Sequence, residues 1–283
     1  MKKLMIIFST LGLVLVATVA ILLFLPDFPG FFAAEPAPAM AVLLPELPPP
    51  TQPVVVGEAG EARGLQEHDR YTHQTIQDFF TQNQFPEGFV ADNSILPWYL
   101  KLVNRYNVMD DDFEIELAYI GQRYFDARAT DALFAMIDYA GELDLNIVVL
   151  SAYRGISHQR WLFNNQVQRR LDAGDTQEQA FEAARRVVAY PGTSEHNLGL
   201  AVDLAVRGTY TLTEAFGQTD EGLWLVENAH RFGFVLRYPY YKQHITNIIY
   251  EPWHFRYVSE YHATVMFEND LVLEEYLFWL SLR

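Results

Sequence analysis

The sequence contains no cysteine and few basic residues: 20 lysines and arginines stand against 36 aspartates and glutamates, which gives a formal net charge of −16. Without cysteine the chain has no disulfide, and any bound metal must be held by nitrogen and oxygen ligands. A nucleic-acid partner is not expected, because phosphate neutralisation requires a basic surface. Half of the 283 residues are hydrophobic, which is enough for one substantial globular domain.

An uncharged run at residues 4–25 follows Lys2 and Lys3. As a helix it would be about 33 Å long, enough to cross a bilayer, and the lysines would keep its start on the cytoplasmic side. Residues 1–25 are therefore predicted to be a signal anchor, a single-pass helix in the cell membrane with the body on the extracytoplasmic, cell-wall side. The small residues at 37–39 resemble a cleavage site but lie well past the apolar run, so we expect the anchor to remain uncleaved.

The rest of the chain divides by composition. Residues 26–56 are predicted to be an extended linker, because nine of the fourteen prolines fall between Pro26 and Pro53. Residues 57–95 form a polar N-terminal extension without assigned chemistry, in which Ile76, Phe79 and Phe80 share a short helical face. Residues 96–283 are predicted to be the compact body.

Within the body, apolar spacing predicts helices at 130–143, at 159–188 with a break near 172–175, at 213–233 and at 271–280. β-branched or alternating runs predict strands at 146–150, 199–204, 234–241 and 248–250. In the strand at 199–204, Leu200, Val202 and Leu204 form the face that enters the core. Asp203 lies on the opposite face beside small residues, which leaves room for an ion.

Two motifs distant in sequence carry the chemistry. The first, Ser194 to Asp203, contains His196, and the second, Glu251-Pro-Trp-His254, adds another imidazole and another carboxylate. A catalytic zinc keeps three protein ligands and leaves a fourth position to water, so we predict one Zn²⁺ per chain, held by His196, Asp203 and His254. Glu251 is the predicted base, which takes a proton from the water and passes it to the leaving amine. Arg154, in the turn after strand 146–150, is the predicted partner of an oxyanion or substrate carboxylate.

Plainer interpretations exist for each part. A lone His-x6-Asp or Glu-x-x-His is common by chance, and it is their joint presence that favours a metal. Trp253 either walls the cleft or packs in the core. Ser194 is not predicted to be a nucleophile, because no Gly-x-Ser-x-Gly motif surrounds it. The histidines without matching partners are expected at the surface or as caps: His158, His230, His244 and His262.

The ordered motifs resemble the VanY-type D-alanyl-D-alanine carboxypeptidases, zinc peptidases of the LAS superfamily, over roughly residues 97–265. They are Ser151-Ala-Tyr-Arg154 with Gln159, residues 191–203, Arg237-Tyr-Pro239 and residues 251–257. The resemblance implies a compact α+β domain with a central antiparallel sheet flanked by helices, and it implies the same zinc ligands and base. It also implies that Arg154, Gln159 and Ser194 contact the substrate. Tyr153 and Trp253 are further candidate substrate contacts.

The same resemblance implies a hydrolase that removes the C-terminal D-alanine from peptidoglycan stem peptides, as a D,D- or an L,D-carboxypeptidase, and we expect a monomer. Two alternatives stay open: a peptidoglycan endopeptidase that cuts crosslinks, and a non-catalytic zinc module that binds wall peptides. The predicted anchor argues against the first, and the presence of Glu251 argues against the second.

The sequence departs from the family pattern at four positions. Ala152 stands where glycine is usual, Gly155-Ile156 where serine and an aromatic residue are common, and Asn247 where glycine is usual. Asparagine tolerates a left-handed backbone better than other non-glycine residues, so we expect the turn at Asn247 to persist. The change at 155 and 156 borders Arg154 and bears on substrate preference.

Overall fold

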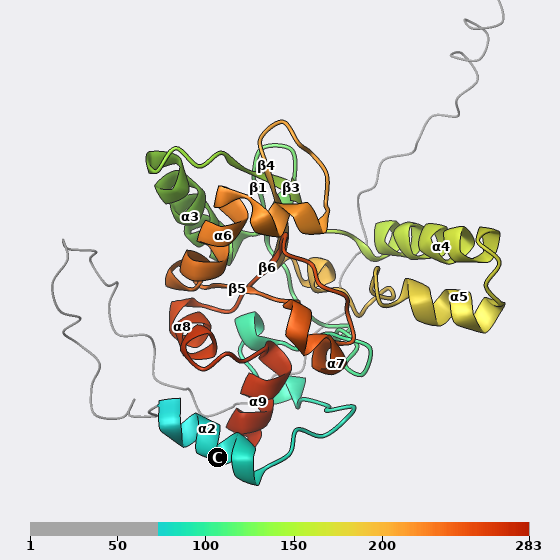
Figure 1. The fold of residues 1–283 in the computed structure, drawn as a ribbon, viewed down its shortest axis with the longest axis horizontal. Helices are drawn as coiled ribbons and strands as arrows, with labels where there is room; N and C mark the ends of the chain where they lie inside the picture. The colour runs from blue at the N-terminus through green and yellow to red at the C-terminus, as the bar shows by residue number, and fades with distance from the viewer. Residues whose placement is uncertain (1–72, 283) are drawn as a thin grey trace, which may run out of the picture. The chain divides into compact units, whose positions relative to one another are not determined.

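A four-stranded antiparallel sheet in the order β3-β4-β6-β5 lies at the centre of the computed structural model, which describes residues 73–282 (Figure 1). Its strands are β3 (Ile147–Ser151), β4 (Ala201–Val206), β6 (His254–Tyr257) and β5 (Phe234–Leu236). A separate hairpin pairs β1 (Leu117–Tyr119) with β2 (Tyr124–Asp126). The predicted anchor and linker lie outside the described residues. Within residues 73–282, no helix is both long enough and apolar enough to cross a membrane.

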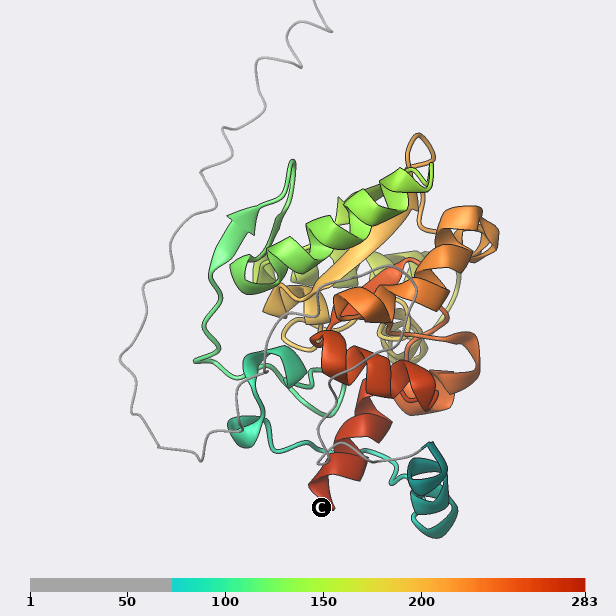
Figure 2. The same cartoon turned by 90° about the vertical axis from the view of Figure 1, so that its left-hand side faces the viewer.

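Helices surround the sheet on several sides (Figure 1). The α-helices are α2 (His73–Gln82), α3 (Thr130–Glu142), α4 (Ile156–Asp172), α5 (Gln177–Ala184), α6 (Asp220–Asn228), α7 (Gln243–Thr246), α8 (Glu260–Glu268) and α9 (Leu273–Ser281). Short 3-10 turns are η1 (Asn93–Ile95), η2 (Trp98–Leu100), η3 (Ala127–Ala129), η4 (Glu195–Leu198), η5 (Glu214–Gln218), η6 (Ala229–Phe232) and η7 (Tyr240–Lys242). Figure 2 shows α3 lying along the sheet, while α4 and α5 form a hairpin beside it in Figure 1.

The first core cluster lies between one face of the sheet and helices α3 and α6. Leu200, Val202 and Leu204 are fully buried there, in contact with the cluster that contains Leu133 and Leu225. The face assignment predicted for 199–204 is therefore confirmed. Because side chains alternate along a strand, Asp203 is left on the other face.

A second core cluster joins α2, α8 and α9. Ile76 is fully buried in it, and Phe79 and Phe80 pack against it, as expected for one short helical face. Leu277 of α9 belongs to the same cluster. Packed residues therefore extend N-terminal to Leu96, into the last part of the polar extension.

The regular elements with strong local periodicity are confirmed: the helix at 130–143, the strand at 146–150, the break near 172–175 and the closing apolar helix. The predicted helix at 213–233 is interrupted, because the Thr219 hydroxyl accepts a hydrogen bond from the Gly222 N–H and starts α6 anew. The predicted strand at 248–250 is wrong: this segment is irregular, and Ile249 N–H donates to the Arg186 carbonyl at 3.0 Å.

His262 is not the surface or capping residue that the sequence suggested. It is partly buried on α8, and its Nδ1 lies 2.6 Å from the Tyr276 hydroxyl of α9. Burial lowers the pKa of His262 to about 4, so the ring is neutral at physiological pH. The contact fixes the C-terminal helix to the body.

Gly233 gives a stability prediction. It ends η6 with a φ of +83°, and a Cβ there would lie 2.8 Å from Tyr257 Cε2 and 3.0 Å from the Glu260 backbone nitrogen. We expect Gly233→Ala to lower the free energy of unfolding by about 1–3 kcal/mol. The control is Gly141→Ala on α3, where the new methyl group would have open space around it. Because alanine has the higher helix propensity, we expect this variant to raise the free energy of unfolding by about 0.5–1 kcal/mol. Urea denaturation measures both, and equal effects would contradict the assignment of strain to Gly233.

Candidate metal centre and catalytic site

The three predicted ligands converge on the face of the sheet opposite the first core cluster. The register of β4 and β6 sets Asp203 directly opposite His254, and η4 brings His196 alongside. Asp203 Oδ2 lies 3.2 Å from His196 Nε2, and Asp203 Oδ1 lies 3.1 Å from His254 Nδ1. All three side chains are buried, and their ligand atoms lie within 4.8 Å of one another.

These donors fit a zinc ion. His196 Nε2 is buried without a hydrogen-bond partner, although Asp203 is close, which marks it as a free ligand atom. The other ring nitrogens have acceptors: His196 Nδ1 lies 2.6 Å from the Ala152 carbonyl oxygen, and His254 Nε2 lies 3.3 Å from Glu195 Oε2. Zinc-binding histidines typically donate their second N–H in this way. Two imidazole nitrogens and one carboxylate oxygen form a zinc donor set with room for water.

The sequence around His196 also holds the loop that carries Arg154. Arg154 N–H donates to the His196 carbonyl at 3.0 Å, and Asn197 Nδ2 donates to the Arg154 carbonyl at 2.6 Å. Asn197 Oδ1 accepts from the Gly192 N–H at 3.1 Å. Gly199 ends η4 with a φ of +70°, and a Cβ there would crowd a neighbouring side chain at 3.3 Å. The motif therefore needs its glycine and asparagine as well as its ligands.

Glu251 lies at the edge of the three ligands because His254 N–H donates to the Glu251 carbonyl at 3.1 Å and closes a tight turn. Glu251 Oε2 lies 3.7 Å from His254 Nδ1. Burial, reinforced by the negative charge of Asp203 and opposed by His254, raises the pKa of Glu251 to about 8. A bound divalent cation would draw this pKa down again. A buried carboxyl group at this position suits a proton acceptor near neutral pH.

Arg154 faces the same site. Its NH2 atom lies 3.6 Å from Asp203 Oδ2, and its Nε is buried without a hydrogen-bond partner in the described chain. Burial lowers the pKa of Arg154, and the charges of Asp203 and Glu251 oppose that effect. The guanidinium therefore retains donor capacity for a carboxylate or an oxyanion.

The remaining predicted contacts differ in their placement. Gln159 is buried, its Nε2 donates to the Ala189 carbonyl at 2.7 Å, and its Oε1 has no partner. Ser194 is buried immediately before η4, and Tyr153 is half-buried beside Arg154 in the chain. Trp253 is half-buried and packs against the first core cluster.

Two residues of the site had no role in the sequence analysis. Tyr238 is buried, its ring centroid lies 4.8 Å from that of His254, and its carbonyl accepts from the Glu251 N–H at 3.1 Å. Burial and the charge of Glu195 raise the pKa of Tyr238 well above its usual range, so its phenol remains a donor. Glu195 is the acceptor for His254. Both residues lie inside the motifs that resemble the family, and their place in those motifs is the sequence feature that could have identified them.

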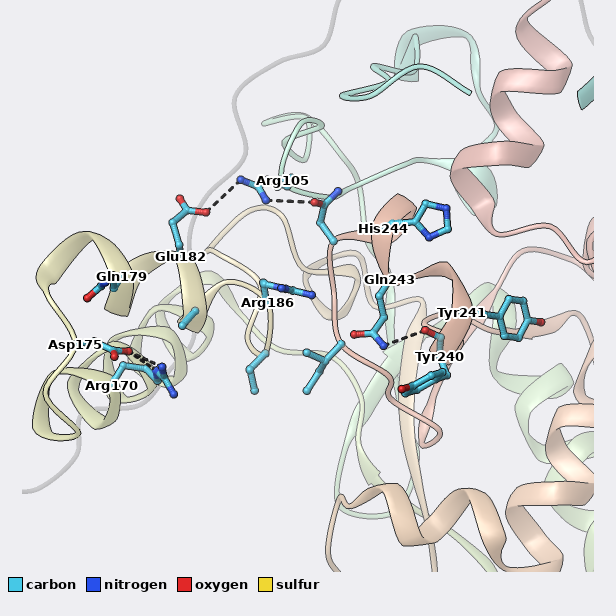
Figure 3. Close-up of a pocket in the computed structure, with 14 residues that line it drawn as sticks. Arg105, Arg170, Asp175, Gln179, Glu182, Arg186, Tyr240, Tyr241, Gln243 and His244 are labelled. Carbon is cyan, nitrogen blue, oxygen red and sulfur yellow. Dashed lines mark hydrogen bonds and ion pairs between the residues drawn. The ribbon is translucent and has the colours of Figure 1, made fainter. Parts of the chain in front are cut away.

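A groove of about 1160 Å³ lies elsewhere, between α5 and the segment at 240–249 (Figure 3). Arg186 points into it from the end of α5 toward Gln243 and His244. Its lining contains none of the predicted site residues. The buried donor atoms, not the volume of a cavity, therefore identify the candidate metal centre.

Comparison with known proteins decides the family. The protein-family model described as "VanY: D-alanyl-D-alanine carboxypeptidase" matches residues 122–260 of the chain. A solved variant of the D,D-pentapeptidase VanY from a VanB-type resistance cassette, in complex with Zn(II), is 38% identical, with a TM-score of 0.59, over 64% of this chain and 99% of that one. The chain belongs to the VanY family. The resemblance inferred from the motifs and the compact α+β fold are thereby confirmed.

Two further relatives bear on activity. A D-alanyl-D-alanine carboxypeptidase of Enterococcus faecalis (strain ATCC 700802 / V583) is 39% identical over 182 residues, 64% of this chain and 66% of the relative, just under two thirds of its length. The solved L,D-carboxypeptidase LdcB is 38% identical, with a TM-score of 0.54, over 62% of this chain and 84% of that one. The Zn(II) in the solved VanY variant agrees with zinc as the ion that the His-Asp-His group of this chain could hold.

The role of Glu251 can be separated from metal binding. We expect Glu251→Gln to keep zinc bound, because the ligands are untouched, and to lower kcat by about 10²-fold or more, because the amide accepts no proton. Zinc content by atomic absorption and hydrolysis of a D-alanyl-D-alanine peptide measure the two properties. Loss of zinc together with activity would instead make Glu251 part of the metal-binding set.

Proposed function

We propose that this protein removes the C-terminal D-alanine from peptidoglycan stem peptides, with its body held on the cell-wall side of the membrane by residues 1–25 and acting as a monomer. The observation that carries the proposal is the buried group of His196, Asp203 and His254, with Glu251 and Arg154 beside it. The names of the relatives support the substrate: one is a D-alanyl-D-alanine carboxypeptidase, and the LdcB structure is described as revealing the molecular basis of peptidoglycan recognition. The anchor rests on the sequence pattern alone.

The residues divide the reaction between them. Bound zinc, held by the three ligands, would activate the attacking water by lowering its pKa. Glu251 takes the proton of that water and delivers it to the amine of the departing D-alanine. Arg154 pairs with the terminal carboxylate of the substrate or with the developing oxyanion. The Tyr238 phenol, protonated and close to His254, is placed to donate a further hydrogen bond.

The pentapeptide stem, which ends in D-alanyl-D-alanine, is the substrate that we propose first. The matched family model and the enterococcal relative both carry that activity in their names. The tetrapeptide stem is the second candidate, because the L,D-enzyme LdcB is as similar in sequence as the D,D-enzyme, at 38% identity each. Sequence identity does not separate the two.

Synthetic stems test the activity directly. The full chain in detergent is incubated with tetrapeptide, pentapeptide and crosslinked stems, with and without a chelator, and released D-alanine is measured. We expect release from the pentapeptide, loss of at least about 10-fold on chelation, and recovery with added Zn²⁺. Release from the tetrapeptide alone would replace D,D- by L,D-activity. Cleavage of crosslinked stems only, or of none, would overturn the carboxypeptidase assignment.

Arg154 gives a second test. Lysine keeps the positive charge but lacks the planar guanidinium group that donates two parallel hydrogen bonds to a carboxylate. We expect Arg154→Lys to lower kcat/KM for the pentapeptide by about 10–100-fold, equivalent to about 1.4–2.7 kcal/mol. A pentapeptide with an amidated C-terminus should be a poor substrate of the unchanged protein, and Arg154→Lys should reduce its cleavage much less. An equal loss on both peptides would assign Arg154 to the oxyanion instead.

A further inference from the structure

A line of buried charged side chains connects the C-terminal helix to the metal centre. Glu195 Oε2 lies 3.3 Å from His254 Nε2, and Glu195 Oε1 accepts from Arg237 Nε at 2.7 Å. NH1 and NH2 of Arg237 donate to the two carboxylate oxygens of Glu274, on α9, at 2.8 and 2.7 Å. The side chains of Glu195 and Arg237 are fully buried, and that of Glu274 is 2% exposed.

A second arginine completes the hydrogen bonding of Glu195. Arg256 NH1 donates to Glu195 Oε1 at 2.9 Å, while its NH2 and Nε donate to backbone carbonyls. Asn104 Nδ2 donates to Glu274 Oε1 at 3.1 Å. Two carboxylates therefore face two guanidinium groups, and this charge balance matters because an unpaired buried charge is strongly destabilising.

The arrangement leaves Glu195 with one free oxygen. Because both arginines donate to Oε1, Oε2 remains the acceptor for His254, and this orients the ring with Nδ1 toward Asp203. An acceptor in this position fixes the tautomer of a metal-binding histidine and raises its basicity. Glu274 in turn balances the positive charge of Arg237. Without Glu274, Glu195 would be the only carboxylate paired with Arg237.

We propose that Glu274 is a positioning residue for the zinc ligand His254, acting through Arg237 and Glu195. The C-terminal helix is thus part of the support of the metal centre and not only a cover of the second core cluster. The inference rests on the proposed function only in taking His254 as a zinc ligand.

Adjacent residues of α9 supply a matched pair of variants. Glu275 is also buried, pairs with Lys242 Nζ at 2.9 Å, and accepts from the Val272 N–H at 3.0 Å, but has no contact with Glu195. Glu274→Gln removes a charge from the line to His254, and Glu275→Gln removes one from the same helix outside that line. Thermal unfolding of the two variants reports the structural cost of each.

Zinc affinity is the decisive readout, measured on the full chain by competition with a chromophoric chelator. Loss of an outer partner of a metal ligand typically weakens metal binding by about 10–100-fold, which we expect for Glu195→Gln. For Glu274→Gln we expect about 3–10-fold, because it acts one residue further away. Glu275→Gln should stay within about 2-fold of the unchanged protein, whatever its melting temperature. Equal weakening by Glu274→Gln and Glu275→Gln would overturn the proposal.

The visible spectrum of the Co²⁺-substituted protein gives a readout that a stability change does not mimic. We expect a shifted spectrum in Glu274→Gln and an unchanged one in Glu275→Gln. Glu274→Asp keeps the carboxylate, so its zinc affinity should lie between those of Glu274→Gln and the unchanged protein. It also replaces Glu274→Gln in the test if that variant does not fold. A Glu274→Asp variant as weak as Glu195→Gln would contradict a role for the charge. These measurements need no peptide hydrolysis, so they stand apart from the test of the proposed function.

Discussion

The pairing of Asp203 with His254 across β4 and β6 is the constraint on which the rest of the site depends. The backbone ladder fixes this register, and the register decides that a carboxylate and an imidazole share the face opposite the first core cluster. A shift of either strand by one residue would turn that strand's ligand into the apolar core and separate the two. His196 lies on a 3-10 turn that ends at Gly199, and this turn places its imidazole beside Asp203 and His254 as the third ligand. Metal chemistry here is a consequence of strand register.

Buried charge is the second constraint, and it explains why the motifs extend beyond the ligands. Glu195, Arg237 and Arg256 are all at most 1% exposed, and each has its partner within 3 Å. Removing one partner of such a group costs about 3–5 kcal/mol, because the other charge is left unpaired. These residues therefore act as a unit, and the sequence must keep them together. Glu251 differs, because burial outweighs the charges of His254 and Arg154 and raises the pKa of its carboxyl group.

Sequence reasoning succeeded where the signal is local or where a motif carries it. Alternation along 199–204 identified the core face and left Asp203 free, and helical spacing identified α3 and α9. It failed where partners are distant: 248–250 has β-branched residues, but it lies beside the Arg186 carbonyl rather than in a ladder. The link from Glu195 to Glu274 joins residues far apart in the chain and has no periodicity. No pattern within a single sequence predicts that two acidic residues share one arginine.

The departures from the family pattern differ in their physical consequences. Asn247 adopts a φ of 59°, as expected of a residue in place of glycine, so this substitution preserves the turn before Glu251. Gly155 is different, because a Cβ there would contact the Tyr153 hydroxyl at 3.8 Å, and glycine leaves that space open at the start of α4. Tyr153 and Gly155 flank Arg154, whose guanidinium faces the metal centre. Because strands and buried charge fix the metal centre, we expect substitutions in this loop to change the substrate preference of the protein without changing its metal ligands.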